Sequence, residues 1–152
     1  MKNNQLEGKV IGIALNNNLF LTGLITRQNK NILLGYFFKE MYENLPNITE
    51  WKPSEVCLIC LFGALGIKNK SWKIIGDLPS WNRQEWEVPI LKQRDPINDS
   101  VYYAIVYDDN IVSSKKYCIS EEESEKYYRY GIYGYKAVEI VLGNILGVLL
   151  KS

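Results

Sequence analysis

Three short apolar runs separated by asparagine-rich turns make up most of the first 38 residues, and they constrain the fold strongly. The runs occupy residues 9–15, 19–27 and 32–38. Asparagine tolerates left-handed backbone angles and is common in hairpin turns, so the turns at residues 16–18 and 29–31 indicate tight connections between strands. The pattern predicts an antiparallel meander.

More strands are predicted downstream of the meander. Residues 56–62 form a continuous apolar run, as expected of a strand that is buried on both faces. Aromatic residues make up 12% of the chain, with eleven Tyr, and they favour strands because they fit half-buried pleated surfaces. The remaining candidate strands cover residues 72–75, 88–92, 101–107 and 116–119.

Two helices are expected near the C-terminus. Ser120 followed three positions later by Glu123 forms a capping box, and apolar residues at three- and four-residue spacing predict a helix over residues 135–149. The chain of 152 residues shows no repeat or linker and has the size of one domain. We predict a single domain, residues 1–152, with an α+β, mainly β fold. It would be a twisted antiparallel sheet or partly closed barrel with one or two C-terminal helices packed on it.

Charge and composition narrow the class of function. The formal net charge of +1 argues against direct nucleic-acid binding, which usually needs a basic excess. Histidine, the commonest general base and transition-metal ligand, is absent. We therefore expect no enzyme, no metal and no cofactor. The first residues do not read as a signal peptide, and the most apolar stretch, residues 137–150, is too short to span a bilayer. A cytoplasmic protein without a membrane partner is expected.

Three cysteines are too few for a disulfide framework. Cys57 and Cys60 match C-x-x-C, but they lie inside an apolar run rather than in a turn, and Cys118 alone cannot complete a zinc site. We interpret Cys57 and Cys60 as buried structural thiols.

Two groups of residues are candidate contacts for a protein partner. Trp81, Arg83 and Trp86 lie in a polar, Pro-flanked segment, where aromatic rings either pin a loop to the core or anchor an interface. The acids Glu121, Glu122 and Glu123 either dock a basic partner or form a solvated first helical turn. We predict that both groups face the partner.

Three segments, in this order, resemble the immunity protein 26 family of bacterial immunity proteins. They are GKVIGIALNNNLFLTGLITR (residues 8–27), SWKIIGDLP (residues 71–79) and YGIYGYKAVEIVL (residues 130–142). Residues on the family's pattern are expected to be structural: Gly8, Gly23, Trp72, Gly76, Pro79, Gly131, Gly134 and Glu139.

The resemblance implies an antidote in a polymorphic toxin system of the kind that includes contact-dependent inhibition. Such a protein binds the C-terminal toxin domain of a cognate effector, often a nuclease, and neutralises it by occlusion. The apolar C-terminal stretch, where a more charged helix is expected, leaves a homodimer open. Two rival interpretations are a small β-barrel module that binds a ligand or nucleic acid, and an enzyme that uses carboxylates or Tyr.

Overall fold

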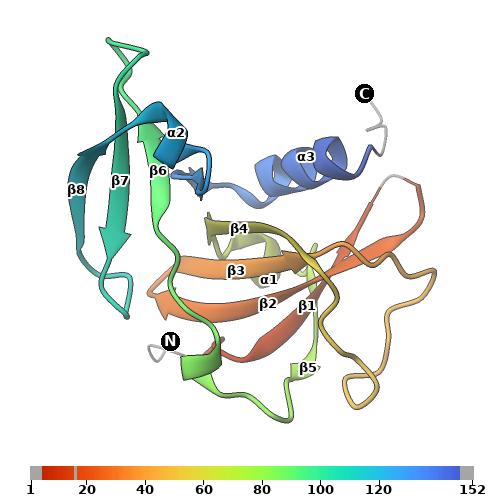
Figure 1. Cartoon of the computed structure of the whole chain (residues 1–152). Helices are drawn as coiled ribbons and strands as arrows, with labels where there is room; N and C mark the ends of the chain where they lie inside the picture. Colours follow the sequence, from red (N-terminus) through yellow and green to blue (C-terminus); the bar gives the residue numbers. More distant parts are fainter. Residues whose placement is uncertain (1–4, 16, 148–152) are drawn as a thin grey trace.

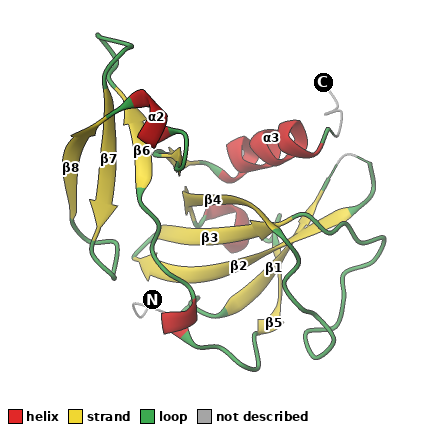
Figure 2. Ribbon diagram, viewed as in Figure 1, coloured by secondary structure: helices red, strands yellow, loops and turns green. Residues whose placement is uncertain are grey.

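A computed structural model describes residues 5–15 and 17–147 of the chain. Its strands form a six-stranded and a four-stranded sheet, and its longest helix, α3, lies beside the larger sheet (Figures 1 and 2). In chain order the elements are β1 (Lys9–Ala14), β2 (Phe20–Asn29), β3 (Ile32–Phe38), β4 (Val56–Gly63), α1 (Leu65–Lys68), β5 (Lys73–Asp77), η1 (Arg83–Glu85), β6 (Leu91–Arg94), β7 (Tyr102–Tyr107), β8 (Ser114–Ile119), α2 (Glu121–Ser124), β9 (Tyr128–Arg129), β10 (Ile132–Tyr133) and α3 (Tyr135–Leu146).

The predicted meander forms the centre of the larger sheet, whose strand order is β10-β4-β3-β2-β1-β5. Strands β1 to β4 pair antiparallel with their chain neighbours. Asn18 and Lys30 adopt positive φ angles of 64° and 55°. The first turn therefore contains a left-handed asparagine as predicted, whereas in the second turn the left-handed residue is Lys30, between two asparagines. Asn16, part of the first predicted turn, lies outside the described residues.

The smaller sheet has the strand order β8-β7-β6-β9, and one segment joins it to the larger sheet. Within residues 128–133, β9 pairs parallel with β6 of the smaller sheet. Three residues later β10 pairs parallel with β4 of the larger sheet. The segment therefore bonds to both sheets through strands separated only by Tyr130 and Gly131.

Three apolar clusters hold these layers together. The first fills one face of the larger sheet beneath α1 and α3 and contains the buried Trp72. The second lies on the opposite face, where Trp51, Trp81 and Trp86 pack around β3 residues. The third lies between the sheets and consists of Leu34, Leu61, Leu91, Ile105 and Ile111.

The predicted fold class is confirmed, because the molecule is mainly β with a helix at its C-terminal end. Of the two predicted arrangements, the partly closed barrel is wrong. The larger sheet keeps β5 and β10 as separate edges, and the smaller sheet packs across its face. The sheets are also not purely antiparallel, since each contains one parallel pair.

Candidate functional site

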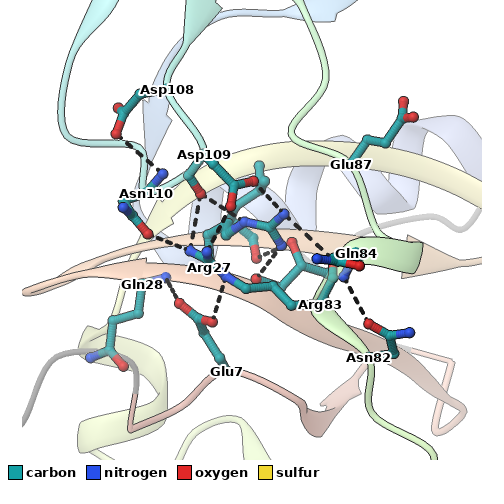
Figure 3. Close-up of polar contacts among 12 residues, drawn as sticks. Glu7, Arg27, Gln28, Asn82, Arg83, Gln84, Glu87, Asp108, Asp109 and Asn110 are labelled. Carbon is teal, nitrogen blue, oxygen red and sulfur yellow. Dashed lines mark hydrogen bonds and ion pairs between the residues drawn. The ribbon is translucent and has the colours of Figure 1, made fainter.

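A polar cleft opens where the two sheets meet. Strand β2 supplies one wall, and strand β7 with the turn that follows it supplies another. Helix η1 and the segment between it and β6 complete the site. The cleft has a volume of about 430 Å³ and is lined by Arg27, Gln84, Glu87, Val88, Tyr107 and Asp109. Figure 3 shows the Arg27, Arg83 and Asp109 side chains pointing toward one another.

Arg27 is the buried cation at the base of this cleft. Its side chain is only 2% exposed, and burying a charge is costly unless it is paired and hydrogen-bonded. Nη2 pairs with Oδ1 of Asp109 at 2.8 Å, and Nε donates to the Asp109 carbonyl oxygen at 2.8 Å. Nη1 donates to the Thr26 carbonyl oxygen at 2.7 Å. These contacts satisfy the guanidinium within the protein.

Arg83 completes the network from η1, whose first turn is capped by Asn82. Its Nη1 lies 2.7 Å from Oδ2 of Asp109, so the two arginines hold the two oxygens of one carboxylate. Its Nε donates at 3.1 Å to Glu7, whose side chain is 7% exposed. Arg83 therefore links the N-terminal segment, η1 and the turn after β7.

The hydrogen bonds and charges around Asp109 favour its ionised carboxylate. Hydrogen bonding from Arg27 and the charges of Arg27 and Arg83 hold the pKa of Asp109 below its usual value. Backbone N–H groups, led by that of Ser113, lower the pKa of Asp108 as well. A general acid needs the opposite shift, so the arrangement favours ion pairing over proton transfer.

Tyrosines beside the cleft are held in the neutral form. Tyr36 on β3 donates to the Glu87 carbonyl oxygen, and burial raises its pKa to about 12. Burial, followed by a hydrogen bond with Tyr130, raises the pKa of Tyr107 to about 12. Both side chains therefore act as hydrogen-bonding groups near pH 7.

The residues predicted to face a partner form two separate groups. Trp81, Arg83 and Trp86 lie together on the segment that covers the larger sheet. Trp86 packs edge-on against Tyr36, with ring centroids 5.2 Å apart, and Trp81 packs against Gly8. Both indole rings are half-buried, and Arg83 is engaged by the cleft network.

The acidic group lies elsewhere. Glu121, Glu122 and Glu123 form the first turn of α2, which lies beside β6 and β7 at the far end from η1 (Figure 1). Oγ of Ser120 accepts a hydrogen bond from the Glu123 N–H at 3.0 Å, so the predicted N-terminal cap is confirmed. Glu121 and Glu122 are exposed, and Glu123 is half-buried.

Two of the family-pattern residues, Trp72 and Glu139, contact each other. Nε1 of the buried Trp72 donates to Oε2 of Glu139 at 2.9 Å, which links the start of β5 to α3. Gly8 has a φ of 85° and lies against the Trp81 ring. The others take backbone positions: Gly23 in β2 against Phe37, Gly76 in β5 beside Ile48, exposed Pro79 after β5, Gly131 between β9 and β10, and Gly134 at the N-cap of α3.

Sequence reasoning missed Arg27, Glu7 and Asp109 as members of one ionic network. The available signal was a single cation at the end of an otherwise uncharged strand-forming run, residues 19–27. Cys57 and Cys60 are buried, as predicted, and burial raises the pKa of each thiol.

Within residues 5–15 and 17–147, no group of three or more His, Cys, Asp or Glu side chains could hold a metal ion. No helix in that part of the chain is long and apolar enough to cross a membrane.

Comparison with known proteins gave one family. The family model described as immunity protein 26 matches residues 6–102, which is more than half of the chain. The match includes the first two segments on which the resemblance rests and ends before the third. No curated protein and no solved structure matched.

Proposed function

Because the chain belongs to the immunity protein 26 family, we propose that it is a single-domain antidote that binds and neutralises a cognate toxin. The family match over residues 6–102 is the observation that carries this proposal. The partner would be the C-terminal toxin domain of a bacterial effector in a polymorphic toxin system, including systems of contact-dependent inhibition. Neutralisation would take place in the cytoplasm. Nucleases are a common class of such toxins.

The mode of action would be occlusion by binding, without catalysis. The ionic groups of the cleft support this, because Arg27, Arg83 and Asp109 are already paired with one another. A lowered pKa at Asp109 is what an ion-pair partner requires. An interface of standard size, about 1,200–2,000 Å², and nanomolar affinity, about −12 kcal/mol, would suffice for a stable complex.

We propose that two regions of the chain contact the toxin domain. One is the segment carrying Trp81, Arg83 and Trp86, and the other is the acidic turn of Glu121, Glu122 and Glu123. The half-buried rings support the first region, since an indole can pack on the core and still present an edge. Exposed Glu121 and Glu122 support the second. Reversing the two acids with E121K/E122K should weaken the complex without unfolding the chain.

Co-expression with the toxin domain encoded beside this chain tests the function. We expect cells that carry both to survive, cells that carry the toxin domain alone to die, and the two proteins to co-purify in a fixed ratio. A toxin domain inactivated by mutation should still co-purify, which separates binding from survival. Death of the co-expressing cells, with no complex recovered, would refute the proposal.

The mass of the free protein from light scattering decides between a monomer and a homodimer. Ile140 and Ile145 are exposed on α3 and would be covered in a dimer that uses this helix. Charge substitutions at these two positions would then convert the dimer to a monomer.

A further inference from the structure

The smaller sheet carries a basic pocket that lies outside the cleft between the sheets. Lys92 and Arg94 come from β6, Tyr102 from β7 and Arg129 from β9, and together they line a space of about 130 Å³. Strand register explains their meeting. Lys92 is the direct cross-strand partner of Arg129, and Arg94 is the partner of Tyr102. Neighbours in register share a face of the sheet, so three cations converge.

The pocket contains more positive charge than the fold neutralises. Arg94 lies 3.5 Å from the exposed Asp99 carboxylate, and its Nε donates to the Asp99 carbonyl oxygen at 2.7 Å. Within the part of the chain that the structure describes, the Lys92 and Arg129 side chains make no hydrogen bond or ion pair. Like charges directly opposite each other destabilise a sheet, so this pair costs folding free energy.

An anionic group would remove that cost. The guanidinium of Arg94 is oriented by the Tyr102 ring, whose centroid lies 5.8 Å away, and by its contact with Asp99. Lys92 is half-buried and Arg129 is exposed, so both remain reachable from solvent. The space suits one carboxylate or one phosphate rather than a larger ligand.

The surroundings favour a carboxylate over a nucleic-acid backbone. Helix α2, which packs against β7, exposes Glu121 and Glu122 beside the same sheet. A polyanion that followed this surface would run past Glu121 and Glu122, whereas a single acidic side chain would occupy the pocket alone. The net charge of +1 also gives little general attraction for nucleic acid.

We infer that the pocket formed by Lys92, Arg94, Tyr102 and Arg129 receives an acidic side chain of the toxin domain. This inference rests on the proposed function and adds the chemistry of the partner. The toxin would present an Asp or Glu to the pocket, flanked by groups that complement the acids of α2. The unneutralised Lys92–Arg129 pair would then serve recognition, because its two cations gain an anionic partner only in the complex.

A charge-reversal cycle at Lys92 and Arg129 tests the inference. Lys92→Glu or Arg129→Glu alone would place opposite charges across the β6–β9 ladder, so the melting temperature should rise by about 1–3 °C. Each single variant should nevertheless bind the toxin domain about tenfold more weakly, and the double variant about 100-fold more weakly. In the double variant the rise in melting temperature should be smaller than the sum of the two single rises, because two like charges again face each other across the ladder. If the pair had only a structural role, the single substitutions would raise the melting temperature without weakening toxin binding.

The matched control is Lys52→Glu with Lys136→Glu, which changes the net charge equally at exposed lysines away from the pocket. Its affinity, measured by calorimetry in 50 mM NaCl, should stay within about threefold of the wild type. Raising the salt to 300 mM should weaken the wild type more than the K92E/R129E variant.

Each outcome has a distinct meaning. If the wild type rescues cells and K92E/R129E binds as tightly as it does, the pocket assignment falls and the antidote function stands. If the wild type neither rescues nor binds, both fall. A labelled single-stranded oligonucleotide that binds the wild type more tightly than the toxin domain does, and loses binding in K92E/R129E, would replace the carboxylate with a nucleic-acid phosphate.

Discussion

In the part of the chain that the structure describes, Arg27 is the one lysine or arginine that is buried, and its guanidinium is almost completely removed from water. A buried charge is tolerated only when its partners are present, and those of Arg27 come from its neighbour Thr26 and from the turn after β7. Asp109 supplies both a carboxylate oxygen and its carbonyl oxygen. The stability of β2 in the folded molecule therefore depends on a residue 82 positions away.

Asp109→Ala should lower the free energy of unfolding by about 2–3 kcal/mol, because it leaves the buried Arg27 charge without its carboxylate. The matched control is Asp99→Ala, which removes the partner of the exposed Arg94 and should cost less than about 1 kcal/mol. Urea unfolding of the two variants beside the wild type gives both values. Equal costs would mean that Arg27 finds other partners or is reached by water.

At Gly8, a single added Cβ atom would clash with the Trp81 ring. Its φ of 85° suits glycine, and a Cβ there would lie 2.8 Å from Cγ of Trp81. Gly8→Ala should therefore cost about 1–3 kcal/mol and displace the Trp81 ring. Gly63→Ala, where a Cβ meets no atom within 4 Å, should change stability by less than about 0.5 kcal/mol. Thermal melts followed by tryptophan fluorescence compare them, and indistinguishable melts would contradict the expected clash.

At the scale of elements, features set by neighbouring residues were predicted well from the sequence. Strands that depend on partners far along the chain were not. The boundaries of β3 and the cap at Ser120 agree with the sequence, because turn residues and capping boxes act within a few positions. Strand β6 starts three residues after the predicted start of 88–92, and β9 and β10 were missed. Two-residue strands carry no periodicity, and their existence depends on partners far along the chain.

Contacts between distant residues also determine where the helices end and how the sites are built. Helix α2 ends after one turn because the chain must return to β9, a constraint that no capping signal contains. The predicted last helix, residues 135–149, is observed to Leu146, and residues 148 and 149 lie outside the described part of the chain. The pairing of Arg27 with Asp109 and the basic pocket could not be predicted, since both arise from strand register and inter-sheet packing.

The contact between Trp72 and Glu139 joins two elements and can be tested separately. Glu139→Ala would leave the indole N–H of Trp72, whose residue is 1% exposed, without an acceptor, at a cost of about 1–3 kcal/mol. Glu139→Gln keeps an acceptor oxygen and should cost less than about 1 kcal/mol. The comparison uses urea midpoints of both variants. Identical losses would show that the carboxylate charge, rather than the hydrogen bond, holds α3 in place.

At the scale of the whole molecule, acid should loosen the contact between the sheets. The pKa of Asp109 is lower in the folded state than its unfolded value of about 3.9. A carboxyl shifted in this direction contributes stability that is complete above the unfolded pKa and is lost as the pH falls through the folded pKa. Asp109 is 65% exposed, so solvent moderates the effect.

We therefore expect the wild type to lose stability as the pH is lowered from about 5 through the folded pKa, and Asp109→Asn to lose less over the same range. Urea midpoints measured at several pH values between 7 and 3 give the two curves. The variant starts lower at pH 7 and its curve should be flatter. Parallel curves would assign the acid sensitivity to other carboxyls, among which Asp95 and Asp108 also have lowered pKa values.

The short segment that contains β9 and β10 would also affect the thermodynamics of the proposed complex. Each strand pairs with a different sheet, so the sheets cannot separate without breaking at least one of the two pairings. A protein with two loosely hinged halves must give up that freedom when it is captured, and the lost entropy weakens binding. Here most of that ordering is already complete in the free chain. A toxin-binding surface that includes both sheets would thus be pre-organised, which would favour a long-lived complex without additional contacts.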